Sequence, residues 1–219
     1  MLPWRQDTPL VLDGLEHLSQ QLSYALPECI ISQIIISSDR FLGYAWSRYL
    51  FVGKRTAMFP SLDAARFRLE DRHISSLIVD MESLTTSRFA ALAMLRSHCL
   101  SKHGLRTWLL VSHQDPPMKA FLAAAGPFEV LERNQTVQRF RDALLAPPSP
   151  ETSDCFSPTE WQLLTLLAQG QTLVNAARQL KMPYHRAVYR LRTLLQRAGL
   201  PTRQELTQLL HRLSLDVNQ

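Results

Sequence analysis

The stretch FSPTEWQLLTLLAQGQTLVNAARQLKMPYHRAVYRLRTLLQRAGLPTRQELTQ, residues 156–208, decides the fold of the C-terminal third of the chain. It opens with the signals of a helix start: Ser157 is a good N-cap, Pro158 suits the first helical position, and Glu160 completes a capping box. Gly170 is typical of the residue just beyond a helix end. The pattern therefore predicts a helix between these signals.

Three more helices follow on similar signals. Thr172 can cap a second helix, which ends before a tight turn at residues 181–183. A third helix has apolar residues at helical spacing and a fourth follows a second capping pair; the residues concerned are Ala187, Leu191, Leu194 and Ala198, then Thr202 and Glu205. Two helices joined by a three-residue turn and braced by two others predict a helix-turn-helix domain.

The net charge of the chain lies in this same region. Residues 156–219 contain eight Lys or Arg and three Asp or Glu, a net charge of +5, whereas residues 1–155 contain sixteen of each. Four of the bases lie on the expected third helix: Arg186, Arg190, Arg192 and Arg197. A basic helix after a tight turn is the electrostatic pattern of a module that binds phosphate groups of nucleic acid.

Four short motifs in this stretch have the spacing of a known family: S-P-x-E at 157–160, L-L-A-Q-G at 166–170, A-x-x-L at 177–180 and A-G-L at 198–200. On these motifs the segment resembles the C-terminal helix-turn-helix of the LuxR/NarL class of bacterial transcription factors. The resemblance implies a regulator of transcription that binds double-stranded DNA.

The resemblance also implies which side chains meet DNA, because in the family the third helix, here residues 184–197, enters the major groove. The core-facing residues set its rotation, so that Val188, Tyr189 and Arg192 face away from the core. Arg192 is the best candidate for reading a base, since arginine can pair bidentately with guanine. Val188 and Tyr189 can contact thymine methyl groups, and the candidates for phosphate contact are Arg186, Arg190, Arg197, Thr172 and Val174.

Each assignment has a simpler structural alternative. A single arginine on a helix usually belongs to a solvated face, and Tyr189 is equally suited to packing. The sequence also departs from the family, which commonly has Gly at the position of Lys181 and a small N-cap at that of Pro183. If the left-handed backbone of the family is retained, Lys181 adopts a conformation that is unfavourable for a residue with a side chain.

The resemblance implies a dimer on two half-sites, through the last helix. Its apolar residues are Leu206, Leu209, Leu210 and Leu213. Their alternative role is to close the core of the domain itself. The expected partner is a second copy of the chain or another response regulator.

Residues 31–145 alternate short apolar strands with helices. The strands are expected at 34–36, 55–59, 76–80, 107–112 and 128–131. This order predicts an α/β domain with a doubly wound parallel sheet. A Pro/Ser-rich linker at 146–155 precedes the all-α domain at 156–215, and residues 1–30 are expected to form an extension with an amphipathic helix.

The order of these elements is similar to that of a response-regulator receiver domain. On that resemblance Asp80 corresponds to a vestigial phosphoacceptor and Ser112 to the hydroxyl position. The simpler alternatives are that Asp80 caps the next loop or helix and that Ser112 is a plain loop hydroxyl. The acidic pair that binds a divalent metal falls on Ser37-Ser38, and the lysine falls near Glu132-Arg133. Neutral serines cannot supply the charge that holds the metal, so we expect a pseudo-receiver that works without phosphorylation, a layout similar to the RcsA/BglJ group.

Two other classes of regulator are compatible with the sequence. Trp46 and Tyr49 are compatible with a pocket for an acyl-homoserine lactone, as in quorum-sensing LuxR proteins. A protein that titrates another regulator without touching DNA is the second alternative.

An enzyme is not expected, because the sequence has no catalytic constellation and no nucleotide-binding loop; no cofactor is expected either. His98, Cys99 and His103 form only a loose group, so no metal site is predicted. The three scattered cysteines and the absence of a signal peptide or of an apolar run of about 20 residues indicate a cytoplasmic protein.

Overall fold

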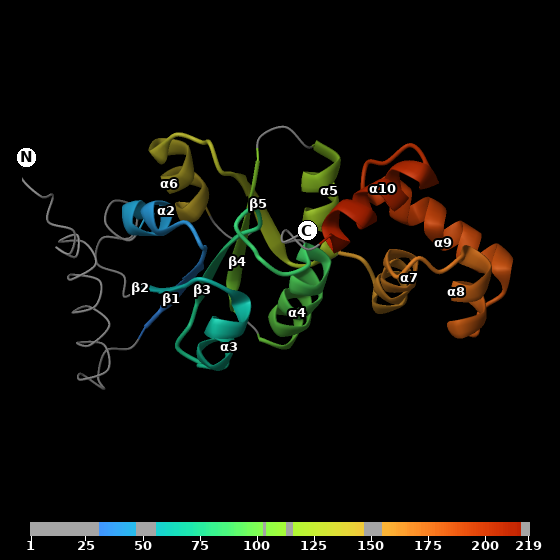
Figure 1. The fold of residues 1–219 in the computed structure, drawn as a ribbon, viewed down its shortest axis with the longest axis horizontal. Helices are drawn as coiled ribbons and strands as arrows, with labels where there is room; N and C mark the ends of the chain where they lie inside the picture. Colours follow the sequence, from blue (N-terminus) through green and yellow to red (C-terminus); the bar gives the residue numbers. More distant parts are fainter. Residues whose placement is uncertain (1–30, 47–55, 103, 113–115, 147–154, 216–219) are drawn as a thin grey trace, which may run out of the picture.

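The computed structural model describes residues 31–46, 56–102, 104–112, 116–146 and 155–215. The first part is a five-stranded parallel sheet with strand order β2-β1-β3-β4-β5 (Figure 1). The strands are β1 (Gln33–Ile36), β2 (Thr56–Phe59), β3 (Ser76–Asp80), β4 (Arg106–Val111) and β5 (Phe128–Glu132). The predicted strands are therefore all present, with ends that differ by a residue or two.

Helices cover both faces of this sheet, as expected for a doubly wound fold. They are α2 (Arg40–Ala45), α3 (Leu62–Leu69), α4 (Arg88–Ser101), α5 (Pro116–Ala125) and α6 (Val137–Leu145). Alternate residues of each strand point to opposite faces, so Ile35 packs with α6 while Ile34 and Ile36 pack with α3 to α5. The expected helix within residues 1–30 lies outside the described residues.

The carboxyl ends of the strands lie along one edge, because the sheet is parallel. Ile36 is in register with Val79, Asp80 with Leu110, and Val111 with Glu132. The strand order changes direction at β1, which has β2 on one side and β3 on the other. Open parallel sheets usually place a functional site at such a point. Residues just beyond β1, β3 and β5 are thereby brought together.

The C-terminal part consists of α7 (Pro158–Ala168), α8 (Leu173–Gln179), α9 (Tyr184–Arg197) and α10 (Arg203–Ser214). The predicted capping box is present: Glu160 N donates to Ser157 Oγ at 3.3 Å, and Ser157 N donates to Glu160 Oε2 at 2.8 Å. Thr172 and Thr202 cap α8 and α10, and Gly170 has a positive φ of 79°. The helix signals in the sequence were therefore interpreted correctly.

The α/β part and the helical part share one apolar core. The α10 helix packs against both α7 and α4, as Figure 1 shows. The Trp161 ring of α7 stacks on Phe89 of α4 at a centroid distance of 5.2 Å, and Phe156 lies 5.5 Å from Phe121 of α5. The two rings at the start of α7 are thus used to join the halves of the molecule.

Arg96 crosses this junction from α4. Its guanidinium donates to the carbonyl oxygens of Ala125 and Phe156, one on each side of the linker, and it lies 5.2 Å from the Trp161 ring centroid. The residue is only 5% exposed. Burial lowers the pKa of Arg96, and the nearby Cys155 and Glu160 oppose that effect. The buried charge is therefore stabilised by carbonyl groups from both halves.

We predict that Arg96→Met lowers the free energy of unfolding by about 2–4 kcal/mol, because two buried carbonyl groups lose a charged donor. Urea denaturation followed by circular dichroism measures this. Arg66→Met is the control, since Arg66 is exposed on α3, and a change within about 0.5 kcal/mol is expected there. Equal losses in the two variants would contradict the role given to Arg96.

Candidate nucleic-acid interface

The turn between α8 and α9 sets the angle at which α9 leaves the domain. Lys181 has a φ of 50°, the only positive value for a non-glycine residue among those described. Its N–H and that of Met182 donate to the carbonyl groups of Arg178 and Ala177, which ends α8. Pro183 then stands at the N-cap of α9 without a side-chain hydrogen bond. Lys181 therefore has a left-handed backbone, which is unfavourable for a residue with a side chain.

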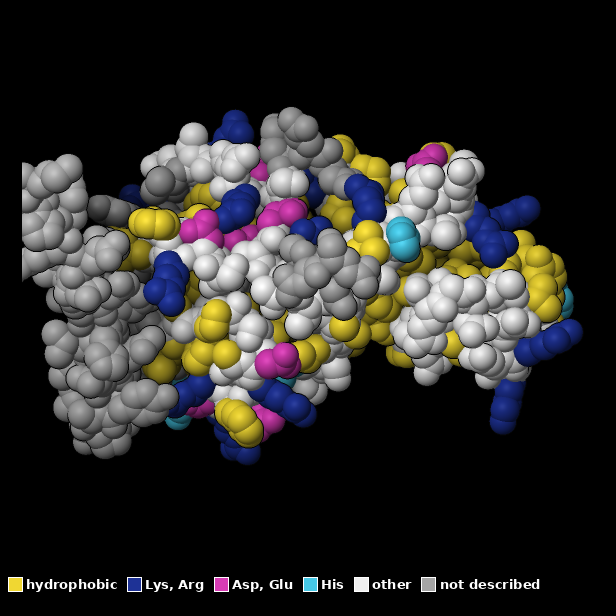
Figure 2. All heavy atoms as spheres, in the orientation of Figure 1, with side chains coloured by type: hydrophobic (Ala, Val, Ile, Leu, Met, Phe, Trp, Pro, Cys, Tyr) yellow, Lys and Arg dark blue, Asp and Glu magenta, His cyan; other side chains and the backbone are white. Residues whose placement is uncertain are grey.

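The α9 helix has one buried face and one exposed face. Ala187, Leu191 and Leu194 are buried, while Tyr189 is 71% exposed and Arg186 and Arg192 are exposed as well. Lys and Arg side chains project from the end of the molecule that is built by α8 and α9 (Figure 2). Tyr189 and Arg192 therefore face away from the core, as predicted.

Val188 corrects part of that prediction. It is half-buried and packs against the core, because it lies one residue after Ala187 and one helical turn before Leu191. It does not face away from the core. Only the edge of its side chain is left for a ligand.

Two of the arginines predicted to contact DNA do not lie on the exposed face of α9. Arg197 pairs with Glu160 of α7, with Nη1 to Oε2 at 3.1 Å, and reaches the carbonyl of Cys155. Arg190 is half-buried, and its Nε has no hydrogen-bond partner. Arg186 and Arg192 are therefore the arginines of α9 that extend freely into solvent.

The acidic side chains of the described helical part do not neutralise these exposed arginines. Glu160 is buried within the capping box and the Arg197 pair, and Glu205 lies in the first turn of α10 beside Thr202. Arg178, Lys181, Arg186 and Arg192 are exposed around the α8–α9 turn. The result is a surface with uncompensated positive charge at one end of the molecule.

The start of α8 lies where sequence reasoning expected a phosphate contact. Thr172 is exposed, but its Oγ1 already accepts a hydrogen bond from Asn175 N at 3.2 Å. Val174 is 43% exposed. The cap leaves the hydroxyl hydrogen of Thr172 and the apolar tip of Val174 available at the surface.

Two residues of the exposed α9 face were missed. Tyr184 is 53% exposed, and His185 is exposed one turn before Tyr189. The spacing of His185, Tyr189 and Arg192 at i, i+4 and i+7 was a usable signal, since such residues share a helix face. The face is therefore aromatic as well as basic.

The leucines of α10 correct the predicted dimer surface. They are 0–1% exposed in the single chain, and the set is Leu206, Leu209, Leu210 and Leu213. They pack in the domain core and toward α4, where Ser87 Oγ also donates to the Leu213 carbonyl at 3.3 Å. The alternative role, closing a core, is the one observed. A partner chain cannot reach these side chains in this arrangement.

The predicted receiver positions meet only in part at the carboxyl edge of the sheet. Asp80 is 1% exposed and accepts a hydrogen bond from Ser37 Oγ at 2.9 Å. Arg133 lies beside it, with Nη2 3.5 Å from Asp80 Oδ2. Glu132 pairs instead with Lys119. Ser112 is exposed, and its N–H donates to Glu82 Oε1 at 3.2 Å.

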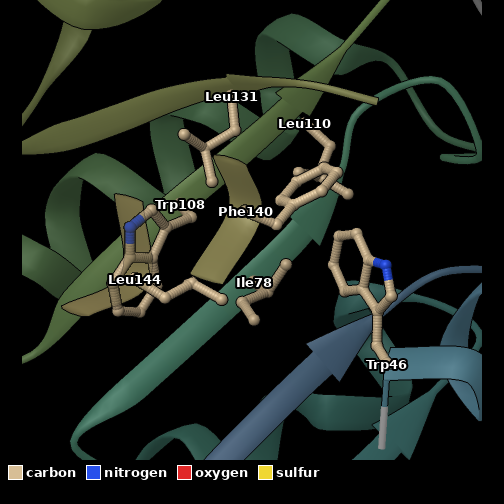
Figure 3. A pocket seen from close by; sticks show the side chains of 7 residues that line it. All are labelled: Trp46, Ile78, Trp108, Leu110, Leu131, Phe140 and Leu144. Atoms are coloured by element: carbon tan, nitrogen blue, oxygen red, sulfur yellow. The ribbon is translucent and has the colours of Figure 1, made fainter. Parts of the chain in front are cut away.

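An apolar recess lies on the face of the sheet that α2 and α6 cover, between the strands and these two helices (Figure 3). Its lining side chains leave no room even for a water molecule, and Trp46 closes it by packing on Phe140 at a centroid distance of 5.2 Å. Pockets for small molecules are typically 300–1,000 Å³ and carry polar anchors. The recess is therefore a packing gap, and Trp46 belongs to the core. Tyr49 and His103 lie outside the described residues.

No described helix is long and apolar enough to cross a membrane. No family model matches the chain. It is 44% identical over 212 residues to the Fimbriae Y protein of Salmonella typhimurium strain LT2, an alignment that covers 97% of this chain and 88% of that protein.

Solved structures of response regulators are similar at lower identity. RcsB from Salmonella enterica serovar Typhimurium, bound to promoter rprA, is 16% identical with a TM-score of 0.45, covering 81% of this chain and 96% of that one. Full-length FixJ from B. japonicum is 14% identical with a TM-score of 0.41, covering 83% and 97%.

The left-handed backbone at Lys181 leads to a prediction. Lys181→Gly should raise the free energy of unfolding by about 1 kcal/mol, because glycine adopts positive φ without a steric cost. Lys181→Val should lower it by at least as much. Chemical denaturation of the full chain measures both. A destabilised glycine variant would contradict strain at this turn.

Proposed function

The chain belongs to the family of the Fimbriae Y protein, and we propose that it is a DNA-binding regulator of transcription whose α9 helix enters the major groove. The observation that carries the proposal is the exposed face of α9, where Arg186, Tyr189 and Arg192 lie together with no acid of the described helices beside them. The relative's name further supports genes for fimbriae as the targets.

The side chains divide into two roles on physical grounds. Arg192 lies within the exposed face and is long enough to place its planar guanidinium against a guanine edge. Arg186, Arg178 and Lys181 surround the turn and suit the phosphates on either side of the groove. Tyr189 offers an apolar ring to a thymine methyl group. Most of the affinity would then come from charge, and the selectivity from Arg192.

Pairing on two half-sites is part of the proposal, because one helix-turn-helix contacts few base pairs. The buried α10 leucines favour another surface for this pairing as long as the halves of the chain stay packed. The partner would be a second copy or another response regulator. A regulator that acts only by titrating a partner would not need the exposed basic face of α9.

We also propose that phosphorylation does not control this protein. The Asp80 carboxylate is buried, accepts hydrogen bonds from Ser37 Oγ and from the N–H of Glu82 at 3.3 Å, and forms an ion pair with Arg133. A phosphodonor must approach a free carboxylate oxygen in line. A carboxylate in this environment is poorly placed for such an attack. A cytoplasmic location follows from the proposed work on DNA.

Arg192→Ala should reduce the preference of the full chain for its selected site by about 1–3 kcal/mol, because a base contact is lost. Arg186→Ala should weaken binding to all duplexes and lower the slope of log affinity against log salt by about one phosphate contact. The duplex is first selected from a random library with the wild-type chain, and fluorescence anisotropy then measures affinity at several salt concentrations.

Arg68→Ala is the matched control, since Arg68 is exposed on α3. Its affinity and salt slope should equal those of the wild type. If the α9 variants also behave like the wild type, α9 is not the DNA-binding element. If the wild type binds no duplex, the proposed function itself is wrong.

The environment of Asp80 predicts that a small phosphodonor does not label the chain. Incubation of the full chain with acetyl phosphate and Mg²⁺ should give no increase of 80 Da in the intact mass, and DNA affinity should not change. A known response regulator labelled in the same buffer is the positive control. Stable labelling that Asp80→Asn abolishes would contradict phosphorylation independence.

A further inference from the structure

Two carboxylates converge at the carboxyl edge of the sheet. Asp80 ends β3 and is 1% exposed, and Asp39 follows β1 as the N-cap of α2. Carboxylates from neighbouring strand ends, with serine hydroxyls beside them, are the oxygen ligands that hard divalent cations take. A buried carboxylate needs a compensating positive charge. Asp39 and Asp80 therefore require a positive charge close to both carboxylates.

The charge comes from the chain itself. Arg133 Nη2 lies 2.5 Å from Asp39 Oδ2 and 3.5 Å from Asp80 Oδ2, so one nitrogen atom stands between the two carboxylates. The backbone N–H of Arg133 donates to the Val111 carbonyl at 2.8 Å, which continues β5 and fixes the origin of the side chain. The guanidinium thus occupies the space in which a cation shared by both carboxylates would have to lie.

The remaining oxygen atoms have partners within the chain. Asp39 Oδ1 accepts from Leu42 N at 3.1 Å, and Asp80 Oδ1 accepts from Glu82 N at 3.3 Å. Ser37 Oγ donates to Asp80 and accepts from Asp39 N at 3.1 Å. A divalent ion would have to displace these bonds and would repel the guanidinium. The residues of this edge do not fit a bound divalent metal.

Two other described bases near this edge, Lys119 and Arg88, are engaged with acids other than Asp39 and Asp80. Lys119 pairs with Glu132, and Arg88 pairs with Glu82 at 3.1 Å. Each of these bases therefore has an acid of its own. Loss of the Arg133 charge would remove the guanidinium that contacts both Asp39 and Asp80.

We propose that Arg133 is a built-in counterion that permanently replaces a divalent cation at the Asp39–Asp80 pair. The receiver-like sheet then keeps its strand-end geometry without any metal, and the removal of one positive charge is sufficient to restore a demand for one. This inference concerns the α/β part alone and holds whether or not α9 binds DNA.

The test compares thermal unfolding of the full chain in EDTA and in millimolar Mg²⁺ or Mn²⁺. The wild type should have the same apparent Tm in both. Arg133→Gln should unfold about 5–10 °C lower in EDTA and recover most of that loss with Mn²⁺. Arg133→Lys, which keeps the charge, should stay insensitive to the metal. The double variant Arg133→Gln/Asp39→Asn should lose the metal response.

Arg139→Gln on α6 is the control for an exposed arginine and should resemble the wild type. A rise in the Tm of the wild type with Mg²⁺ or Mn²⁺ would overturn the proposal, and this arm does not depend on any variant folding. An Arg133→Gln variant that is as stable as the wild type in EDTA, or that gains nothing from either metal, would overturn it as well.

Discussion

The burial of the α7 and α10 helices against α4 and α5 is the constraint on which the rest of the structure depends. It places Trp161 on Phe89 and Phe156 on Phe121, and it surrounds the buried charge of Arg96 with carbonyl groups from both halves. Charge burial of this kind is tolerated only where the geometry is well satisfied. The helical part is therefore held as an extension of the α/β core.

This packing separates two surfaces that the resemblance to LuxR/NarL proteins would have used together. The leucines of α10 face inward and are unavailable, whereas the basic face of α9 is exposed. DNA would thus meet a preformed reading surface. Pairing of two chains, by contrast, requires either another surface or a separation of the two halves.

The sequence was most informative where a signal is local. The capping box at Ser157, the tight turn at Lys181 and the β-branched strand Ser76–Asp80 were all predicted, because each depends on residues within a few positions of one another. The sequence also predicted the exposed position of Arg192, since helical periodicity fixes it once the core residues are known.

What the sequence did not reveal depends on contacts between distant residues. The role of Arg96 requires α4, α5 and α7 to meet, and the pairing of Arg197 with Glu160 spans two helices. Arg133 was placed near the lysine position of a receiver, but its contact with Asp39 arises only when the ends of β1 and β5 share an edge. Helical spacing could not decide which side of α10 faces a partner, because the apolar stripe suits a core and a dimer equally.

The central claim is that the exposed face of α9 contacts DNA. The most direct measurement places a photo-crosslinking phenylalanine analogue at position 189, and separately at position 67, in the full chain bound to its selected duplex. Tyr189 and Phe67 are 71% and 85% exposed, on α9 and α3 respectively, so they are matched aromatic sites. The account predicts crosslinks to bases from position 189 and none from position 67. Equal crosslinking from both sites, or crosslinks from position 189 to protein alone, would contradict it.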